Sequence, residues 1–172
     1  MLKQLIWEKA IDVTNKAIET KKLKPISTKL ESKSEYEIRT LNQSFKINYE
    51  YGPKINPFRP WDKELEISPI GNTHQLILNK YPVELGHLLL ITSEWQAQDG
   101  WLSLEDFNAI NYVEKDTNGL WFFNSCKEAG ASQPHRHIQF LPRSLKDKLC
   151  PRKRYFDLLS EKNRKINNLL DK

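Results

Sequence analysis

Cysteines and long apolar runs are scarce in this sequence, and both shortages limit the kind of protein it can be. The 172 residues include two cysteines, Cys126 and Cys150, which form neither a disulfide framework nor a Cys-x-x-Cys metal pattern. This composition favours a reducing compartment. The strongest apolar run, HLLLIT at 87–92, is too short to span a bilayer, and residues 1–17 lack the apolar core of a signal peptide. We therefore expect a cytoplasmic protein with no membrane partner.

Positive charge is in modest excess, with 27 Lys and Arg against 22 Asp and Glu, a formal net charge of +5. The excess favours acidic partners but does not choose between nucleic acid, nucleotide and phosphate. Much of it lies in 21–24 and 146–154, where a solvated surface is the simplest interpretation. No RRM, KH, zinc-finger or helix-turn-helix signature is present, so no specific nucleic-acid partner is expected.

The order of predicted elements is helix, several strands, helix and further strands. Apolar spacing predicts a helix over 2–20, and an approximate capping box, Ser103 with Asp106, precedes a second helix over 103–115. Strands are predicted at 44–50, 64–69, 74–79, 86–92, 119–125 and 136–141. Apolar and polar residues alternate at 44–50, whereas the continuous apolar run at 86–92 indicates a strand buried on both faces. Consecutive strands without crossover helices indicate an antiparallel or mixed sheet, hence the α+β class.

The segment SQPHRHIQFLP, at 132–142, carries the most informative chemistry. On a strand, side chains alternate between faces, so His135, His137 and Gln139 share one face about 7 Å apart. The opposite face then holds Arg136, Ile138 and Phe140. A row of three polar groups makes a poor core face and a good site.

Three interpretations of this row remain open from spacing alone. An imidazole can attack phosphorus, since it is available unprotonated near neutrality and leaves phosphorus readily. A His-x-His pair can instead chelate a metal, provided that His74, His87 or Cys126 supplies a third ligand. The third possibility is a pair of structural histidines.

The loop before the histidine strand favours the nucleophile. Residues 124–133, NSCKEAGASQ, contain Gly130 between two alanines, followed by Ser132 and Gln133. Such a loop can turn backbone N–H groups toward an anion, and donors beside a nucleophile stabilise the charge that grows during attack on phosphorus. The plainer interpretation of Gly130 is a tight turn. The loop is not a Walker A motif.

The segment resembles the active-site region of the histidine-triad superfamily, with Gln in place of the last His. That replacement is similar to the branch of galactose-1-phosphate uridylyltransferases and diadenosine tetraphosphate phosphorylases (ATP adenylyltransferases). The resemblance implies that His137 is the nucleophile. It also implies that Gln139 bonds the phosphate and stabilises the nucleotidylated histidine.

Further segments resemble the phosphorylases in the same order over residues 1–145. NKYPVELGHLLLIT, at 79–92, is similar to a family segment whose Asn contacts ribose, which implies that role for Asn79; Leu85 stands where Pro is usual. GPKINPFRPWDKELEI, at 52–67, resembles the Lys-x-x-Asn-Pro-Phe loop, so Lys54 is either a polyphosphate contact or a solvated lysine. Residues 23–41 resemble an L-x-P-I-x-T segment followed by a strand.

Together these matches imply a histidine-triad fold with an antiparallel sheet of about five strands and packed helices. Residues 1–145 would form the nucleotidyltransferase domain, including an amino-terminal helix and strand extension, and 146–172 a basic helical tail. The implied reaction cleaves diadenosine tetraphosphate or a related dinucleoside polyphosphate with phosphate, giving ATP and ADP through a covalent His137–AMP. His135 would orient the site, and Asn79 would contact the ribose. Asn124 would brace the loop or touch the ribose. The phosphate would be bound by Gln139, Gly130, Ser132 and Gln133.

The remaining expectations concern cofactors, the other candidate side chains and the alternative functions. No bound metal or other cofactor is expected, although Mg²⁺ is compatible with a polyphosphate substrate. His87 is interpreted as structural, and Phe58 and Trp61 either stack on the base or simply pack. The alternatives are a nucleotide-binding module with little activity, because the carboxyl-terminal half of the phosphorylases is missing, and a metal-dependent hydrolase using His135 and His137.

A homodimer is also expected. The phosphorylases are about twice as long as this chain, so apolar surface that their second half would cover needs another partner. Residues 151–172 offer apolar side chains for that contact. The competing arrangement is a tail that folds back over its own sheet in a monomer.

Overall fold

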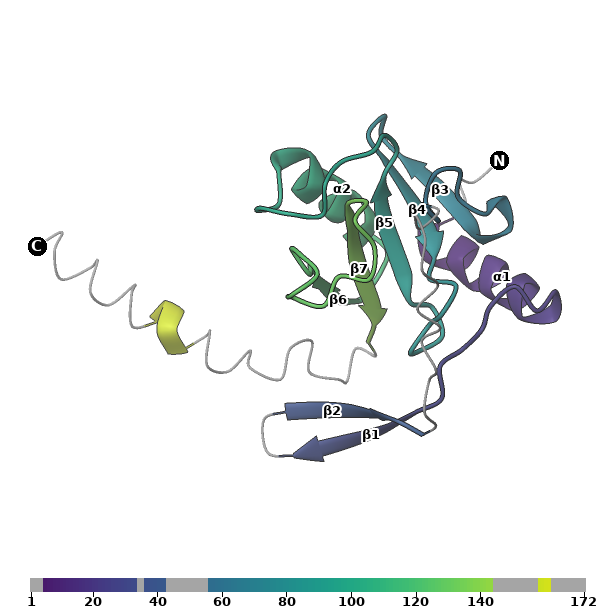
Figure 1. Cartoon of the computed structure of the whole chain (residues 1–172), viewed down its shortest axis with the longest axis horizontal. Helices are drawn as coiled ribbons and strands as arrows, with labels where there is room; N and C mark the ends of the chain where they lie inside the picture. The colour runs from purple at the N-terminus through teal and green to yellow at the C-terminus, as the bar shows by residue number, and fades with distance from the viewer. Residues whose placement is uncertain (1–4, 34–35, 43–55, 144–157, 162–172) are drawn as a thin grey trace, which may run out of the picture.

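The computed structural model describes residues 5–33, 36–42, 56–143 and 158–161, and it has the predicted α+β architecture (Figure 1). A five-stranded antiparallel sheet has the order β3-β4-β5-β7-β6, and β1 and β2 form a separate antiparallel hairpin. The described elements are α1 (Ile6–Glu19), β1 (Thr28–Lys33), β2 (Tyr36–Leu41), the 3₁₀ helix η1 (Lys63–Leu65), β3 (Glu66–Ile70), β4 (His74–Leu78), β5 (Leu88–Thr92), α2 (Leu104–Glu114), β6 (Gly119–Phe122) and β7 (His137–Pro142). Among the described helices, none is long and apolar enough to cross a membrane.

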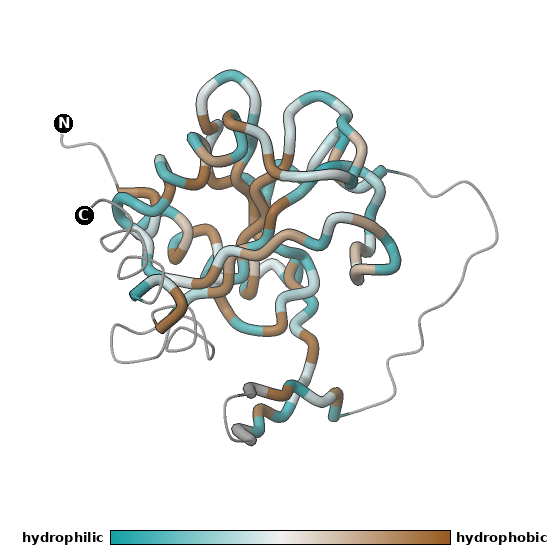
Figure 2. Tube along the Cα trace, turned by 90° about the vertical axis from the view of Figure 1, so that its left-hand side faces the viewer, coloured by the Kyte–Doolittle hydropathy of each residue, from teal (hydrophilic) through white to brown (hydrophobic). Residues whose placement is uncertain are grey.

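The two faces of the main sheet have different neighbours. Both α1 and α2 pack on one face, where alternate strand residues such as Leu76, Leu90 and Phe140 meet buried helix residues such as Ala17 and Val113. In Figure 2 the hydrophobic segments converge on this centre, while hydrophilic residues occupy the outer turns. The second face is left to a smaller apolar cluster and to the loop that precedes η1. A cavity can therefore form on that face.

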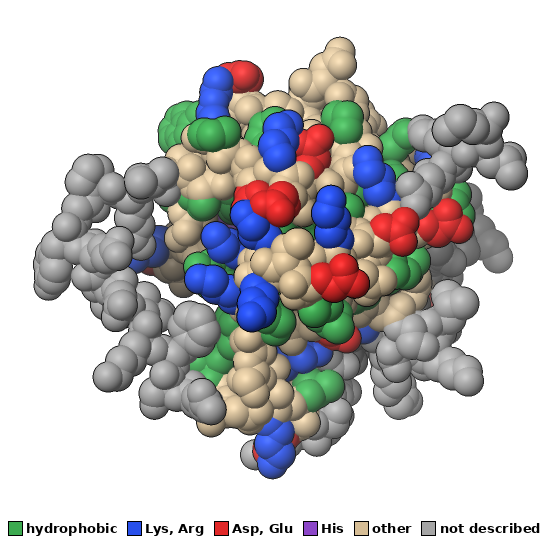
Figure 3. Space-filling model, turned by 90° about the vertical axis from the view of Figure 1, so that its right-hand side faces the viewer, with side chains coloured by type: hydrophobic (Ala, Val, Ile, Leu, Met, Phe, Trp, Pro, Cys, Tyr) green, Lys and Arg blue, Asp and Glu red, His purple; other side chains and the backbone are tan. Residues whose placement is uncertain are grey.

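The surface near α1 carries both signs of charge. Lys and Arg side chains gather over this side of the molecule, with Asp and Glu side chains among them (Figure 3). On α1 itself, exposed Lys9 and Lys16 alternate with exposed Asp12 and Glu19. The apolar residues of the helix, Ala10 and Ala17 among them, face the sheet, which is the amphipathic arrangement that the spacing predicted.

Most predicted elements are confirmed, and two differ. The strand predicted over 119–125 ends at Phe122, because its pairing with β7 stops there. Residues 23–41 were expected to contain one strand and instead form a hairpin of two. Of the helical tail predicted over 146–172, the structure describes only 158–161, which are helical, and the strand predicted at 44–50 lies outside the described residues.

A buried ionic cluster joins α2 to the sheet. The Asp106 carboxylate accepts hydrogen bonds from Arg136 Nη2 at 2.6 Å and His74 Nε2 at 3.0 Å. It also accepts from the Ser103 N–H at 2.7 Å, while Ser103 Oγ accepts from the Asp106 N–H, so the predicted capping box is confirmed. Burial alone would raise the pKa of Asp106, but these bonds outweigh it and hold the pKa well below its usual range. Asp106 therefore stays ionised and ties α2, β4 and β7 together.

We predict that Asp106→Asn lowers the free energy of unfolding by about 3–5 kcal/mol, because the change leaves the Arg136 guanidinium buried without its counter-charge. Urea denaturation followed by circular dichroism measures the loss. The matched control is Glu105→Gln, which alters the exposed neighbouring carboxylate in the same helical turn and should change stability little. Equal effects of the two substitutions would show that the buried cluster contributes no more than a surface charge.

Candidate active site

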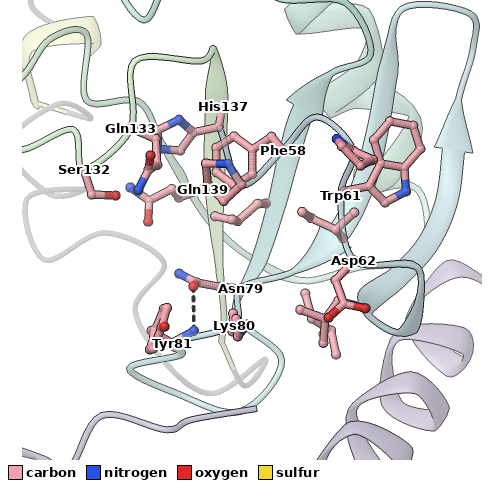
Figure 4. A pocket seen from close by; sticks show the side chains of 16 residues that line it. Phe58, Trp61, Asp62, Asn79, Lys80, Tyr81, Ser132, Gln133, His137 and Gln139 are labelled. Atoms are coloured by element: carbon pink, nitrogen blue, oxygen red, sulfur yellow. Dashed lines mark hydrogen bonds between the residues drawn. The ribbon is translucent and has the colours of Figure 1, made fainter. Parts of the chain in front are cut away.

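A cavity of about 470 Å³ lies on the sheet face that the helices leave free (Figure 4). Its polar wall contains five of the nine residues predicted for the site: Asn79, Ser132, Gln133, His137 and Gln139. Its apolar wall comes from β4, β5, η1 and the loop before η1, and includes Phe58, Trp61, Leu65, Ile77 and Leu89. The cavity thus has an apolar compartment beside a cluster of hydrogen-bonding groups, as sites for small molecules commonly have.

His137 is held in one tautomer and one orientation. Its Nδ1 lies 2.8 Å from the carbonyl oxygen of His135, so Nδ1 carries the proton and donates it to that oxygen. The Nε2 lone pair is then left for the cavity that the ring lines. Burial lowers the pKa of His137, and the bond to His135 only partly opposes this. The side chain is therefore neutral at pH 7, the form in which imidazole is a nucleophile.

His135 lies behind the cavity, with both ring nitrogens engaged by the protein. Its Nε2 donates to the Thr92 carbonyl oxygen at 2.9 Å, and its Nδ1 accepts from Asn56 Nδ2 at 2.9 Å. These bonds leave no ring nitrogen for a metal, which counts against a His-x-His chelate. Among the described residues, no three His, Cys, Asp or Glu side chains converge as a metal-binding group.

The loop before η1 covers the histidine pair. Asn56 Oδ1 accepts from the Phe58 N–H at 3.0 Å, and the Phe58 ring packs against His135 and His137 with centroid distances of 5.7 and 5.3 Å. Trp61 also lines the cavity, and its Nε1 donates to Glu66 at 2.6 Å. Packing against the histidines is thus one role of Phe58 that the structure supports.

Gln139 extends from β7 into the same wall, beside a histidine from the neighbouring turn. His87 Nε2 lies 3.1 Å from Gln139 Oε1, and Asn79 Nδ2 lies 3.4 Å from His87 Nδ1 and 3.3 Å from its Nε2. Asn79 Oδ1 accepts from the Tyr81 N–H at 2.9 Å. Three predicted or candidate residues therefore form one connected group, in which His87 is a direct contact of the site and not only a structural residue of the turn.

The loop at 124–133 approaches the cavity through its last two residues. Ser132 and Gln133 line the wall. Gly130 has φ +96°, a conformation that favours glycine, and its N–H donates to the Lys127 carbonyl at 3.0 Å. Its N–H is thus engaged inside the turn. Asn124 and Gly130 are not among the residues that line the cavity, and Lys54 lies outside the described residues.

Sequence reasoning missed Gln98, which connects the loop to the histidine strand. Gln98 Oε1 accepts from the His137 N–H at 2.7 Å, and its Nε2 donates to the carbonyls of His137 at 3.1 Å and Asn124 at 2.7 Å. Its side chain is 7% exposed. Nothing in the local sequence signals this clamp, because its partners lie 26 and 39 residues away.

Two curated proteins of Saccharomyces cerevisiae (strain ATCC 204508 / S288c) are similar in sequence. Protein APA1 is 30% identical, in a match that covers 59% of this chain and 37% of that protein. Diadenosine 5',5'''-P1,P4-tetraphosphate phosphorylase 2 is 32% identical, with the same shares covered. The chain thus spans less than half the length of the curated relatives it matches.

Solved structures of yeast Ap4A phosphorylase Apa2 share the fold. The complex with AMP superposes with a TM-score of 0.67 at 25% identity, over 86% of this chain and 53% of that one. The structure described without a ligand gives a TM-score of 0.67 at 26% identity, over 86% and 50%. The overlap thus covers most of this chain but only about half of each phosphorylase.

The family comparison extends over most of the sequence. The sequence model of the Ap4A phosphorylase N-terminal domain matches residues 1–153, a span that contains every residue of the cavity wall. With the shared fold and the histidine strand, this match shows that the chain belongs to the Ap4A phosphorylase N-terminal domain family.

Proposed function

We propose that the chain transfers AMP from diadenosine tetraphosphate to phosphate, giving ATP and ADP through a covalent intermediate on His137. The observation that carries the proposal is the fixed tautomer of His137. Its Nδ1–H donates to a backbone carbonyl, which leaves the Nε2 lone pair for the cavity that the ring lines. One relative is named as a phosphorylase of diadenosine tetraphosphate, and a solved relative binds AMP. Both facts support a nucleotide as the ligand here.

The chemistry would proceed in two displacements. In the first, His137 Nε2 attacks an α-phosphorus, a nitrogen–phosphorus bond forms, and the bond from that phosphorus to the bridging oxygen breaks to release ATP. In the second, an oxygen of inorganic phosphate attacks the same phosphorus, the bond to His137 breaks, and ADP leaves. The electron pair on Nε2 is restored, so the enzyme is regenerated with no redox partner.

Groups on the polar wall would stabilise the transferred phosphoryl group. Gln139 lies two residues beyond His137 on the same face of β7, and Ser132 and Gln133 stand on the adjoining loop. Their amide and hydroxyl donors would bond the equatorial oxygens, where negative charge grows during transfer. The backbone of 130–133 would contribute through Ser132 and Gln133, since the Gly130 N–H is engaged within the turn.

The other predicted residues would act around this centre. His135 would hold the Phe58 loop over His137, through the bonds to Asn56 and Thr92. Asn79 would contact the ribose from the floor of the cavity, and Asn124 would support the loop through its carbonyl bond to Gln98. Lys54, together with Mg²⁺, would bind the outer phosphates; no other cofactor is proposed.

A second candidate function is nucleotide binding with little turnover. It is favoured by the 37% coverage of the curated relatives, because groups for the phosphate acceptor can lie in the part that is not matched. Turnover of diadenosine tetraphosphate with and without phosphate separates the two functions. Phosphate-dependent formation of ADP supports the phosphorylase, and binding without turnover supports the module.

We predict that His137→Ala lowers kcat at least about a thousandfold while the dissociation constant for AMP changes much less, because covalent catalysis is removed outright. Initial rates of ADP formation and calorimetric titration with AMP provide the two measurements. His74→Gln is the matched control, since it alters a buried histidine on the opposite face, bonded to Asp106. More than about a tenth of wild-type kcat in His137→Ala would exclude the nucleophile.

We also propose that the chain forms a homodimer through the outer side of α2 and the loop before it. Trp101, Leu104 and Phe107 are 94%, 71% and 55% exposed, an unusual degree for large apolar residues spaced three apart. A two-fold contact between copies would bury them, and such dimers are the commonest soluble assemblies.

Light scattering of the full chain at micromolar concentration should give the mass of a dimer, and Phe107→Glu should reduce it to that of a monomer. Ile11→Glu, at a partly exposed apolar position on α1, should leave the dimer intact. A monomeric full chain would reject the dimer, and aggregation confined to a version ending at Ser144 would instead favour a tail that covers its own sheet.

A further inference from the structure

We propose that His87 is a positioning residue that holds Gln139 with its amide N–H groups toward the phosphate that His137 attacks. This inference rests on the proposed function and assigns a role within it to a residue outside the histidine strand. His87 lies at the turn before β5, and its side chain is 4% exposed. Its backbone is fixed on both sides, since its N–H donates to the Glu84 carbonyl at 3.1 Å and its carbonyl accepts from the Asn79 N–H at 2.9 Å.

The ring of His87 is neutral in this setting. Burial lowers its pKa to about 4; the hydrogen bond to Gln139 only partly opposes this, and the positive charge of Arg39 adds to the lowering. Arg39 forms an ion pair with Glu84, whose Oε2 also lies 3.1 Å from Arg143 Nη1. A neutral imidazole has one N–H donor and one acceptor nitrogen. The donor of His87 therefore has to be assigned to either Nε2 or Nδ1.

The neighbours of the ring favour Nε2–H. Nε2 lies 3.1 Å from Gln139 Oε1, an acceptor. Asn79 Nδ2, a donor, lies 3.3 Å from Nε2 and 3.4 Å from Nδ1, so it does not distinguish the two nitrogens. Asn79 is oriented independently, because its Oδ1 accepts from the Tyr81 N–H. The Gln139 oxygen therefore decides the assignment: His87 Nε2–H donates to it, and Nδ1 is the acceptor nitrogen that remains for the Asn79 amide.

The consequence for Gln139 is the direction of its amide. Oxygen and nitrogen lie on opposite sides of a planar carboxamide, so a carbonyl held by His87 leaves the two N–H donors for the cavity wall that Gln139 lines. The reversed amide would present its oxygen to a phosphate and repel it. His87 therefore selects the orientation in which Gln139 can stabilise the transferred group.

The kinetic test is a double-mutant cycle with His87→Phe, Gln139→Ala and the double variant. We expect His87→Phe to lower kcat about ten- to a hundredfold with less than about a threefold change in KM, because a donor to the developing charge is misaligned. The double variant should match Gln139→Ala, since His87 acts only through Gln139. His87→Gln, whose amide can donate to the same oxygen, should recover part of the loss.

Two outcomes would overturn the role of His87. If the effects of His87→Phe and Gln139→Ala multiply in the double variant, His87 acts by another route, for instance through stability, which thermal unfolding of each variant monitors. If ¹⁵N NMR of the wild-type chain finds the proton of His87 on Nδ1, the Gln139 amide is oriented the other way. The NMR measurement needs no turnover and decides the question even if His87→Phe fails to fold. An inactive wild-type chain with the Nε2–H tautomer would refute the proposed function and leave the geometry intact.

Discussion

Strand β7 presents two sets of side chains, and the geometry of the site depends on how the set facing away from the cavity is anchored. Ile138 and Phe140 are fully buried beneath the helices, and Arg136 is tied to Asp106 at the start of α2. Side chains alternate along a strand, so anchoring one set fixes the direction of His137 and Gln139. The bond from His137 Nδ1 to the His135 carbonyl then sets the ring within that direction. The packing of the core and the orientation of the nucleophile therefore both depend on how this one strand is anchored.

The elements that sequence patterns predict well are those governed by local rules. Alternation along 136–141 separates the core residues from His137 and Gln139 as the structure has them, and the Ser103–Asp106 pair marks the start of α2. The helix at the amino terminus follows from apolar periodicity, and β5 follows from a continuous apolar run whose residues are all buried. The antiparallel sheet itself follows from the short connections between consecutive strands.

Long-range hydrogen bonds account for what the sequence could not predict. His135 shares the spacing of His137 but does not line the cavity, and Thr92 and Asn56 engage its two ring nitrogens from other parts of the fold. Gln98 and His87 lack a local pattern, and their contacts with His137, Asn124 and Gln139 exist only once the sheet has formed. The loop at 124–133 shows the same limit. Its turn at Gly130 was predictable from the sequence, but the hydrogen bond from the Gly130 N–H to the Lys127 carbonyl inside that turn was not.

The central claim is that a neutral, oriented His137 forms a covalent bond to AMP, and the intermediate itself is the most direct observable. Intact-protein mass spectrometry after mixing the wild-type chain with diadenosine tetraphosphate, in the absence of phosphate, should show an added mass equal to one AMP residue. Addition of phosphate should remove the adduct, and fragmentation should place it on His137 within residues 132–142. Phosphate-dependent turnover with no adduct, or an adduct that persists in His137→Ala, would contradict the account.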